Sequence, residues 1–190
     1  MISFAEIEIA LLGLLRLARF DAAFAGFFDL SQQGARRSFR LALWLLPVWL
    51  FIINLNMDWK EAELTRVVAA QLIGYTLSWV CFPLLLLSIA RVLDRGAQIY
   101  GAIAIYNWLS VLSTAINLPI EIAGHYGMSD SWSLTLGYGS VFFVLACEFF
   151  AFQRILQVSI GMALVLVGVD FIVGRIIIDI LVGLAFNEML

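Results

Sequence analysis

The sequence predicts an all-α membrane protein, a bundle of five transmembrane helices preceded by an interfacial helix at the N-terminus. Hydrophobic residues make up 63% of the 190 residues and charged residues only 13%. Soluble domains are about half apolar and about a quarter charged. The mean hydropathy is +1.00. The apolar residues form continuous runs and do not alternate with polar ones, as they would in transmembrane strands.

This composition excludes several classes of protein. Too few polar side chains are present to cover the surface of a small soluble domain, which argues against a soluble enzyme. The formal net charge is −3, so no basic field would attract nucleic acid, and we expect no nucleic-acid partner. The N-terminus lacks the basic region and the cleavage site of a signal peptide. We therefore expect a multi-pass protein, integral to the membrane, in a bacterial inner (plasma) membrane.

Five apolar runs are long enough to be spans. A spanning helix needs about 20 mostly apolar residues, because each residue rises ~1.5 Å across a core of ~30 Å. The predicted spans cover about residues 39–55, 67–90, 97–118, 132–152 and 158–178. Together they form a transmembrane domain over residues 36–190, and short connections make consecutive helices antiparallel neighbours.

Residues 1–35 form the predicted cytoplasmic or interfacial segment. Its apolar run, 9–15, is short and is flanked by charged residues. Burying such residues at mid-membrane costs about 2.5–3.5 kcal/mol each, which favours a helix in the interface. The alternative is a helix packed on the inner face of the protein itself.

Basic residues predict the orientation. The N-terminal segment and the links after the second and fourth spans hold most of the arginines, whereas the loops on the opposite side hold only Lys60 and Arg66. The positive-inside rule then places the N-terminus in the cytoplasm and the C-terminus outside. The candidate contacts with lipid headgroups are Arg36, Arg37, Arg40, Arg91, Arg95 and Arg154.

The third span carries the candidate polar site. Asn107, Ser110 and Thr114 recur at i, i+3 and i+7 and share one helix face. Asp170 lies about 18 Å and Asn107 about 15 Å from the inner boundary, as counted by helical rise. A carboxyl at that depth needs a proton or a hydrogen-bonding partner. We expect Asp170 to meet Asn107, either as structural glue between helices or as part of a polar cavity that relays protons or ions.

Three further ionisable residues fall near the span ends. Glu148 is about 6 Å from the inner boundary, where snorkelling explains it. Arg175 and Asp179 are four residues apart near the outer edge, and this spacing predicts an ion pair along the helix.

Motifs of catalysis are missing from the sequence. It has no H-E-x-x-H, G-x-S-x-G, P-loop or G-x-G-x-x-G pattern. The two cysteines, Cys81 and Cys147, sit in apolar runs, and the single histidine, His125, cannot make a metal site alone. We expect no enzymatic activity, no catalytic residues, no metal and no cofactor.

Two stretches carry a resemblance to a known family. These are residues 38–47, an apolar-aromatic run that ends at Pro47, and residues 96–119, which end at Pro119. With the five-span layout, they make residues 30–180 resemble bacterial members of the Yip1 superfamily. The resemblance implies a cytoplasmic N-terminal segment, five spans and a short outward C-terminus. It implies no catalytic residues.

Two functional hypotheses follow from these features. The first is a non-enzymatic, Yip1-like accessory subunit or membrane organiser that acts through contacts with membrane lipids, other membrane proteins or a second copy of itself. The alternative is a small transporter or channel component that uses Asp170 and the polar third span. A membrane enzyme is the least favoured class, because the sequence offers no catalytic set.

Overall fold

Helices make up nearly all of the structure, a computed structural model that describes residues 4–56, 64–92, 96 and 98–186. The described residues contain no strand, which confirms the all-α class. In chain order the helices are α1 (Phe4–Leu17), the 3₁₀ helix η1 (Ala22–Phe27), α2 (Gln32–Ser38), α3 (Leu41–Asn56), α4 (Leu64–Val92), α5 (Ile99–His125), α6 (Asp130–Leu156) and α7 (Ile160–Phe186).

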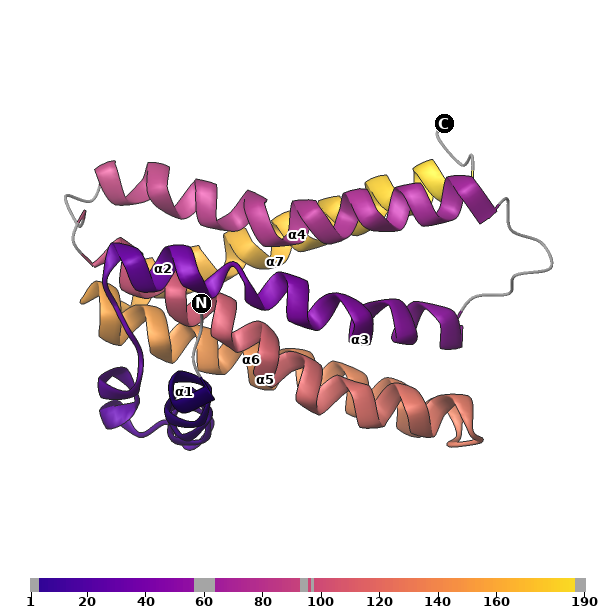
Figure 1. The fold of residues 1–190 in the computed structure, drawn as a ribbon, viewed down its shortest axis with the longest axis horizontal. Helices are drawn as coiled ribbons and strands as arrows, with labels where there is room; N and C mark the ends of the chain where they lie inside the picture. The colour runs from indigo at the N-terminus through magenta and orange to yellow at the C-terminus, as the bar shows by residue number, and fades with distance from the viewer. Residues whose placement is uncertain (1–3, 57–63, 93–95, 97, 187–190) are drawn as a thin grey trace.

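The long helices lie side by side in two pairs. In the view of Figure 1, α4 and α7 run along one side, α5 and α6 run along the other, and α3 lies between them. The most extensive contacts are those of α5 with α6 and of α4 with α7, and α3 packs mainly on α5. The prediction that chain neighbours pack together therefore fits α5 and α6 but fails for α4, whose main partner is the last helix.

Hydrogen bonds join these helices at a few defined points. The Ser140 hydroxyl of α6 donates to Asn117 Oδ1 of α5 at 2.6 Å, and the Tyr75 hydroxyl of α4 donates to the Ala42 carbonyl of α3 at 2.5 Å. Where water is absent, a polar side chain must find its hydrogen-bond partner on a neighbouring helix. Such a bond fixes how one helix is rotated about its axis relative to the next.

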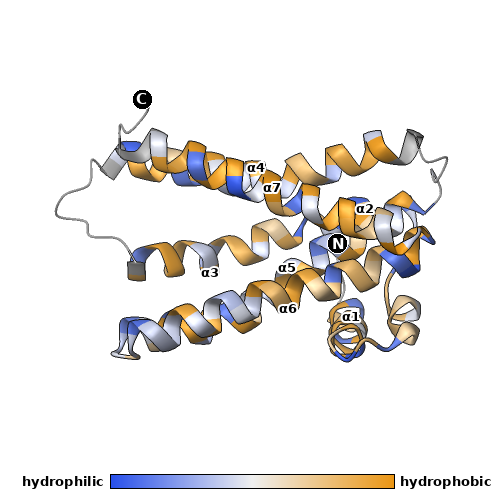
Figure 2. Cartoon of the chain, turned by 180° about the vertical axis from the view of Figure 1, so that it is seen from behind, coloured by the Kyte–Doolittle hydropathy of each residue, from blue (hydrophilic) through white to orange (hydrophobic). Residues whose placement is uncertain are grey.

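Four helices are long and apolar enough to cross a membrane, which supports an integral membrane protein. The four segments are Gln32–Leu55, Thr65–Ile89, Ile99–His125 and Asp130–Leu156. Hydrophobic residues follow α3 to α7 along most of their length, and the joined ends of α5 and α6 are more hydrophilic (Figure 2). Many of these side chains point outward; the Leu43 and Phe142 side chains, for example, are each 70% exposed. A surface of this kind needs acyl chains rather than water around it.

The ends of two predicted spans differ from the helices. α5 continues through Pro119 to His125, so the connection to α6 is confined to 126–129, where Gly127 adopts a φ of 107°. Proline removes one backbone donor without ending a helix whose neighbours support it. α7 begins at Ile160, two residues after the predicted start at 158, and extends beyond 178 to Phe186. The count of five spans, with α7 as the fifth, stays a prediction.

The N-terminal segment folds against one end of the bundle. In Figure 1, α1 is seen nearly end-on while α3 to α7 run across the picture. One face of α1, which includes Leu14 and Leu17, is buried against η1 and the nearby part of α5 and α6. The opposite face exposes Leu11, Leu12 and Leu15. One face of α1 therefore packs on the protein, as the alternative placement expects, and the interfacial placement of its exposed apolar face stays a prediction.

The predicted boundary between residues 35 and 36 falls inside α2 and is not a break in the fold. The Ser31 hydroxyl accepts a hydrogen bond from the Gly34 backbone N–H at 3.1 Å and caps the helix. Such a cap supplies a partner to one of the free N–H groups at a helix start. The helix therefore begins four residues before the predicted boundary, and α2 leads directly into the first span.

Candidate functional site

A cavity of about 400 Å³ lies between the five long helices. We call it the central cavity. Each of α3 to α7 contributes to its wall, and its polar side chains come from four of them. They are Ser78 on α4, Tyr106, Ser110, Ser113 and Thr114 on α5, Glu148 on α6 and Asp170 on α7. Volumes of this size are typical of sites for small molecules.

Three of these residues form a polar cluster, which we call the carboxyl cluster: Tyr106, Glu148 and Asp170. The Tyr106 hydroxyl donates to Asp170 Oδ1 at 2.8 Å. The Glu148 carboxyl interacts with the Asp170 carboxyl from the neighbouring helix. Glu148 is only 3% exposed, and its Oε1 finds no hydrogen-bond partner within the described residues.

Aromatic packing positions the tyrosine. The rings of Phe82 and Tyr106 have centroids 4.8 Å apart, and those of Phe82 and Phe152 are stacked at 5.8 Å. Phe82 and Phe152 are fully buried. Ring contacts of this kind fix an aromatic side chain in one rotamer. The Tyr106 hydroxyl is consequently held at the edge of the cavity, within reach of α7.

The carboxyl cluster brings two acidic groups, Glu148 and Asp170, together where little water can reach them. Two ionised carboxylates in contact repel each other strongly when water cannot screen them. A proton or a cation between them removes this repulsion, and the Tyr106 hydroxyl supplies a donor to only one carboxyl. Within the described residues, Glu148 Oε1 is the oxygen of the cluster that is buried and accepts no hydrogen bond.

The predicted contact between Asp170 and Asn107 is wrong. Asn107 Nδ2 donates to the Ser38 hydroxyl at 2.9 Å, and that hydroxyl donates to the Ala35 carbonyl at 2.7 Å. Asn107 is fully buried and does not line the cavity. Adjacent helix positions are about 100° apart around the axis, so Asn107 faces α2 when Tyr106 faces α7.

The other two members of the predicted site do line the central cavity. Ser110 and Thr114 lie four and eight residues after Tyr106, on the same face of α5. The Thr114 hydroxyl donates to the Ser110 carbonyl of its own helix at 2.8 Å. Sequence reasoning chose the correct helix but began the polar face one residue too late.

Sequence reasoning missed the roles of Tyr106 and Glu148. The i, i+4, i+8 spacing with Ser110 and Thr114 could have pointed to Tyr106. The sequence predicts that Glu148 lies near the membrane boundary, but its side chain faces the central cavity and is almost fully buried. α6 continues for eight residues beyond it, and the N-terminal segment covers that end of the bundle. The depth of Glu148, counted from the end of the apolar run, could not show that the N-terminal segment packs over that end of the bundle.

The predicted pair of Arg175 and Asp179 is present on α7. Arg175 Nη2 lies 2.5 Å from Asp179 Oδ1, and the two side chains are 56% and 63% exposed. Exposed pairs of this kind contribute little to stability, about 0.3–0.5 kcal/mol on a helix in water. The pair therefore neutralises two charges on an apolar helix. Arg175 is bound to Asp179 and not to Asp170, which belongs to the carboxyl cluster.

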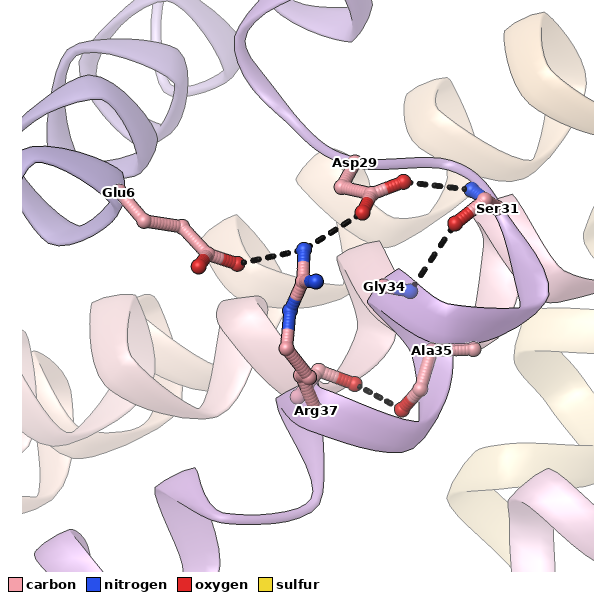
Figure 3. Close-up of polar contacts among 7 residues, drawn as sticks. Glu6, Asp29, Ser31, Gly34, Ala35 and Arg37 are labelled. Carbon is pink, nitrogen blue, oxygen red and sulfur yellow. Dashed lines mark hydrogen bonds and ion pairs between the residues drawn. The ribbon is translucent and has the colours of Figure 1, made fainter. Parts of the chain in front are cut away.

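The candidate headgroup contacts separate into different environments. Arg37 is bound by two carboxylates, with its Nη2 2.6 Å from Asp29 Oδ2 and 3.3 Å from Glu6 Oε1 (Figure 3). Hydrogen bonds from the side chain and backbone N–H of Ser31, together with Arg37, hold the pKa of Asp29 below its ordinary value. Arg37 thus ties α1 and the loop before α2 together, and its role toward lipid headgroups stays a prediction.

The remaining arginines of this set stay candidates for headgroups. Arg36 and Arg40 are exposed on the same end of the bundle. Arg154 is exposed and lies over the Phe150 ring, with 5.3 Å between its Cζ and the ring centroid. Arg91 lies in the last turn of α4, and Arg95 lies outside the described residues.

The described part of the chain holds no group of three or more His, Cys, Asp or Glu side chains placed for a metal ion. Cys81 and Cys147 are free thiols. Comparison of the chain with protein-family models, with curated proteins and with solved structures finds no match. Inference about function therefore depends on the geometry of the central cavity.

Proposed function

We propose that the protein is a small membrane transporter or channel component in which the carboxyl cluster binds and releases a positive charge. The observation that carries this proposal is the placement of two carboxyls, the buried Glu148 and the half-buried Asp170, on the wall of one cavity bounded by all five long helices. Ionisable groups within a membrane are costly and are typical of pathways for ions and protons.

The arrangement offers a way to change the charge of the site without moving a helix. One carboxyl receives the Tyr106 hydroxyl, and the other keeps an oxygen free. Binding a proton or a cation removes the repulsion between them, and its release restores that repulsion. If the contact only held the helices together, we would expect Glu148 Oε1 to accept a hydrogen bond from a donor.

The topology belongs to the same proposal. We place α7 as a fifth span, because its outward side chains, such as Leu164, Phe171 and Ile178, are about half exposed and apolar. The distribution of arginines puts α1 and α2 on the cytoplasmic side of a bacterial inner membrane. This layout matches the one expected from the resemblance to the Yip1 superfamily.

A proton-flux assay tests the proposed function. Purified protein is placed in liposomes that contain a pH-sensitive dye, and a potassium diffusion potential drives protons inward. We expect flux from the wild type and a loss of about tenfold or more, equivalent to over 1.36 kcal/mol in the barrier, for Asp170→Asn and Glu148→Gln. Asp130→Asn is the matched control, because Asp130 is exposed at the start of α6. The absence of flux from every protein, or equal flux from all of them, contradicts the proposal.

A second candidate is the accessory subunit or membrane organiser. One face of α3 favours it, since Leu43, Trp44 and Phe51 are 48–70% exposed and uncovered by the other helices. Purification from native membrane in a mild detergent tests it directly. A partner protein that co-purifies with the wild type and is lost with Trp44→Ala supports this role, whereas a monomer without a partner contradicts it.

A further inference from the structure

One wall of the central cavity is aromatic. Trp49 of α3 and Tyr75 and Trp79 of α4 line it together with Tyr106. The ring centroids of Trp49 and Tyr75 are 4.7 Å apart, and those of Tyr75 and Trp79 are 6.2 Å apart. These three rings form a continuous surface from two helices, and the carboxyls come from the two others, α6 and α7.

Aromatic faces and carboxylates attract the same kind of ligand. A cation over the face of Trp or Tyr is stabilised by about 2 kcal/mol or more when water is excluded, and quaternary ammonium groups are recognised in this way. The residues that line the cavity in the described part of the chain include no Lys, Arg or His. The buried and unpaired Glu148 Oε1 adds a negative partner.

The cavity is poorly suited to small inorganic cations. Hard metal ions take about six or more oxygen ligands. Three of the hydroxyls here are oriented toward other acceptors: the Tyr106 hydroxyl donates to Asp170, and the Ser78 and Thr114 hydroxyls donate to carbonyls of their own helices. An organic cation needs no such set of ligands, because its charge is spread over apolar substituents.

A second hollow adjoins this cavity on the outer side of the bundle. This lateral groove, of about 480 Å³, lies between α4, α6 and α7 and shares Ser78, Tyr106, Val141, Leu145 and Asp170 with the central cavity. Its outer part is mostly apolar and includes Phe142 and Phe171, which are 70% and 49% exposed. Arg175 also lines it, with its charge paired to Asp179. In a bilayer these side chains face acyl chains, so the groove joins the carboxyl cluster to the lipid phase.

We propose that the central cavity binds a lipophilic organic cation that reaches it from the bilayer through the lateral groove. The quaternary or protonated centre lies between the aromatic wall and the carboxyl cluster, and apolar substituents extend into the groove. The inference rests on the proposed function, because it takes the same carboxyls as the charge-binding element. It adds the chemical class of the ligand and its route of entry.

Equilibrium binding of tetraphenylphosphonium to the purified protein in lipid nanodiscs tests this inference. We expect saturable binding that Glu148→Gln and Asp170→Asn weaken by about tenfold or more, with Asp130→Asn as the control. Trp49→Leu tests the aromatic wall, and Trp132→Leu, whose tryptophan is 64% exposed at the start of α6, is its matched control. The carboxyl variants and the tryptophan variants test the site independently. If a carboxyl variant aggregates during size-exclusion chromatography, the comparison of Trp49→Leu with Trp132→Leu still tests the inference.

Two comparison ligands separate the contribution of charge to binding from that of lipophilicity. Triphenylphosphine oxide is similar in its phenyl groups but neutral, and tetramethylammonium is charged but lacks the apolar body. We expect neither to compete effectively with tetraphenylphosphonium. Equal binding of the neutral compound, or equal affinity in all variants, overturns the inference.

Binding and flux distinguish this inference from the proposed function. Proton flux without tetraphenylphosphonium binding overturns the inference and leaves the proposed function standing. Specific binding without proton flux supports the ligand class and overturns the proposed function. Absence of both overturns both.

Discussion

The Tyr106 hydroxyl of α5 donates a hydrogen bond to Asp170 Oδ1 of α7 across 2.8 Å. The two helices do not pack extensively on each other, and most contacts of α7 are with α4 and α6. This bond therefore connects the two sides of the bundle through the central cavity. It is also the contact that determines which carboxyl oxygens stay available for a ligand.

Removal of this donor is expected to destabilise the protein. In Tyr106→Phe, Asp170 Oδ1 loses its partner while the ring contacts of Phe82 remain, and an unsatisfied buried acceptor costs about 1–3 kcal/mol. The midpoint of thermal unfolding in detergent, followed by tryptophan fluorescence, measures the effect. Tyr126→Phe is the control, because Tyr126 is 79% exposed outside the bundle. Equal midpoints for the two variants would show that the bond carries no stability.

The contact of Asn107 with Ser38 gives a second prediction. Ser38→Ala removes the acceptor of the Asn107 amide and leaves a second buried polar atom unpaired on the same side chain. We expect a loss of about 1–3 kcal/mol. Ser88→Ala, whose exposed hydroxyl bonds only to the Leu84 carbonyl, should change stability by less than about 0.5 kcal/mol. Urea or detergent unfolding of both variants, followed by far-UV circular dichroism, provides the measurement.

Gly34 gives a steric prediction at the entrance to the first span. A Cβ atom at this position would lie 1.9 Å from the Asp29 carbonyl oxygen, a backbone atom that cannot rotate away. Gly34→Ala should therefore displace the loop that carries Asp29 and break its contact with Arg37. Faster protease cleavage before α2 reports the change. Gly137→Ala should be neutral or slightly stabilising, because a Cβ atom there would meet no other atom within 4 Å and alanine favours a helix.

Asp29 predicts how the N-terminal segment responds to acid. Its pKa lies below the ordinary value of 3.8, because Ser31 and Arg37 stabilise the ionised form. A depressed pKa in the folded state means that the stabilisation is complete above 3.8 and is lost as pH falls through the folded pKa. We expect the α1 amides of the wild type to lose protection against hydrogen exchange, relative to the rate of an unfolded chain at the same pH, below pH 3.8. In Asp29→Asn, exchange should be faster at neutral pH and should lack this acid-dependent step.

The orientation of the termini is a further test. With five spans, a reporter at the N-terminus is cytoplasmic and a reporter at the C-terminus is periplasmic. Fusions to green fluorescent protein and alkaline phosphatase distinguish the two sides, since each is active on only one of them. Activity of the same reporter at both ends would show that α7 does not cross the membrane.

The sequence by itself determined the local features of this protein. Composition and continuous apolar runs predicted the all-α membrane class, and four of the predicted spans coincide with helices long and apolar enough to cross a membrane. The spacing of Arg175 and Asp179 predicted their ion pair. These features depend on residues near one another in the chain, where helical geometry fixes distances in advance.

Only the tertiary structure decided which side chains meet. Tyr106 rather than Asn107 faces Asp170, Glu148 lies beneath the cover of the N-terminal segment, and Arg37 binds Glu6 and Asp29. Each result depends on how far one helix is rotated about its axis relative to another. A hydrophobic run that is apolar on every side does not specify that rotation, because lipid and protein satisfy the same apolar face. The few polar contacts between helices specify it, and these are formed only when the whole bundle packs.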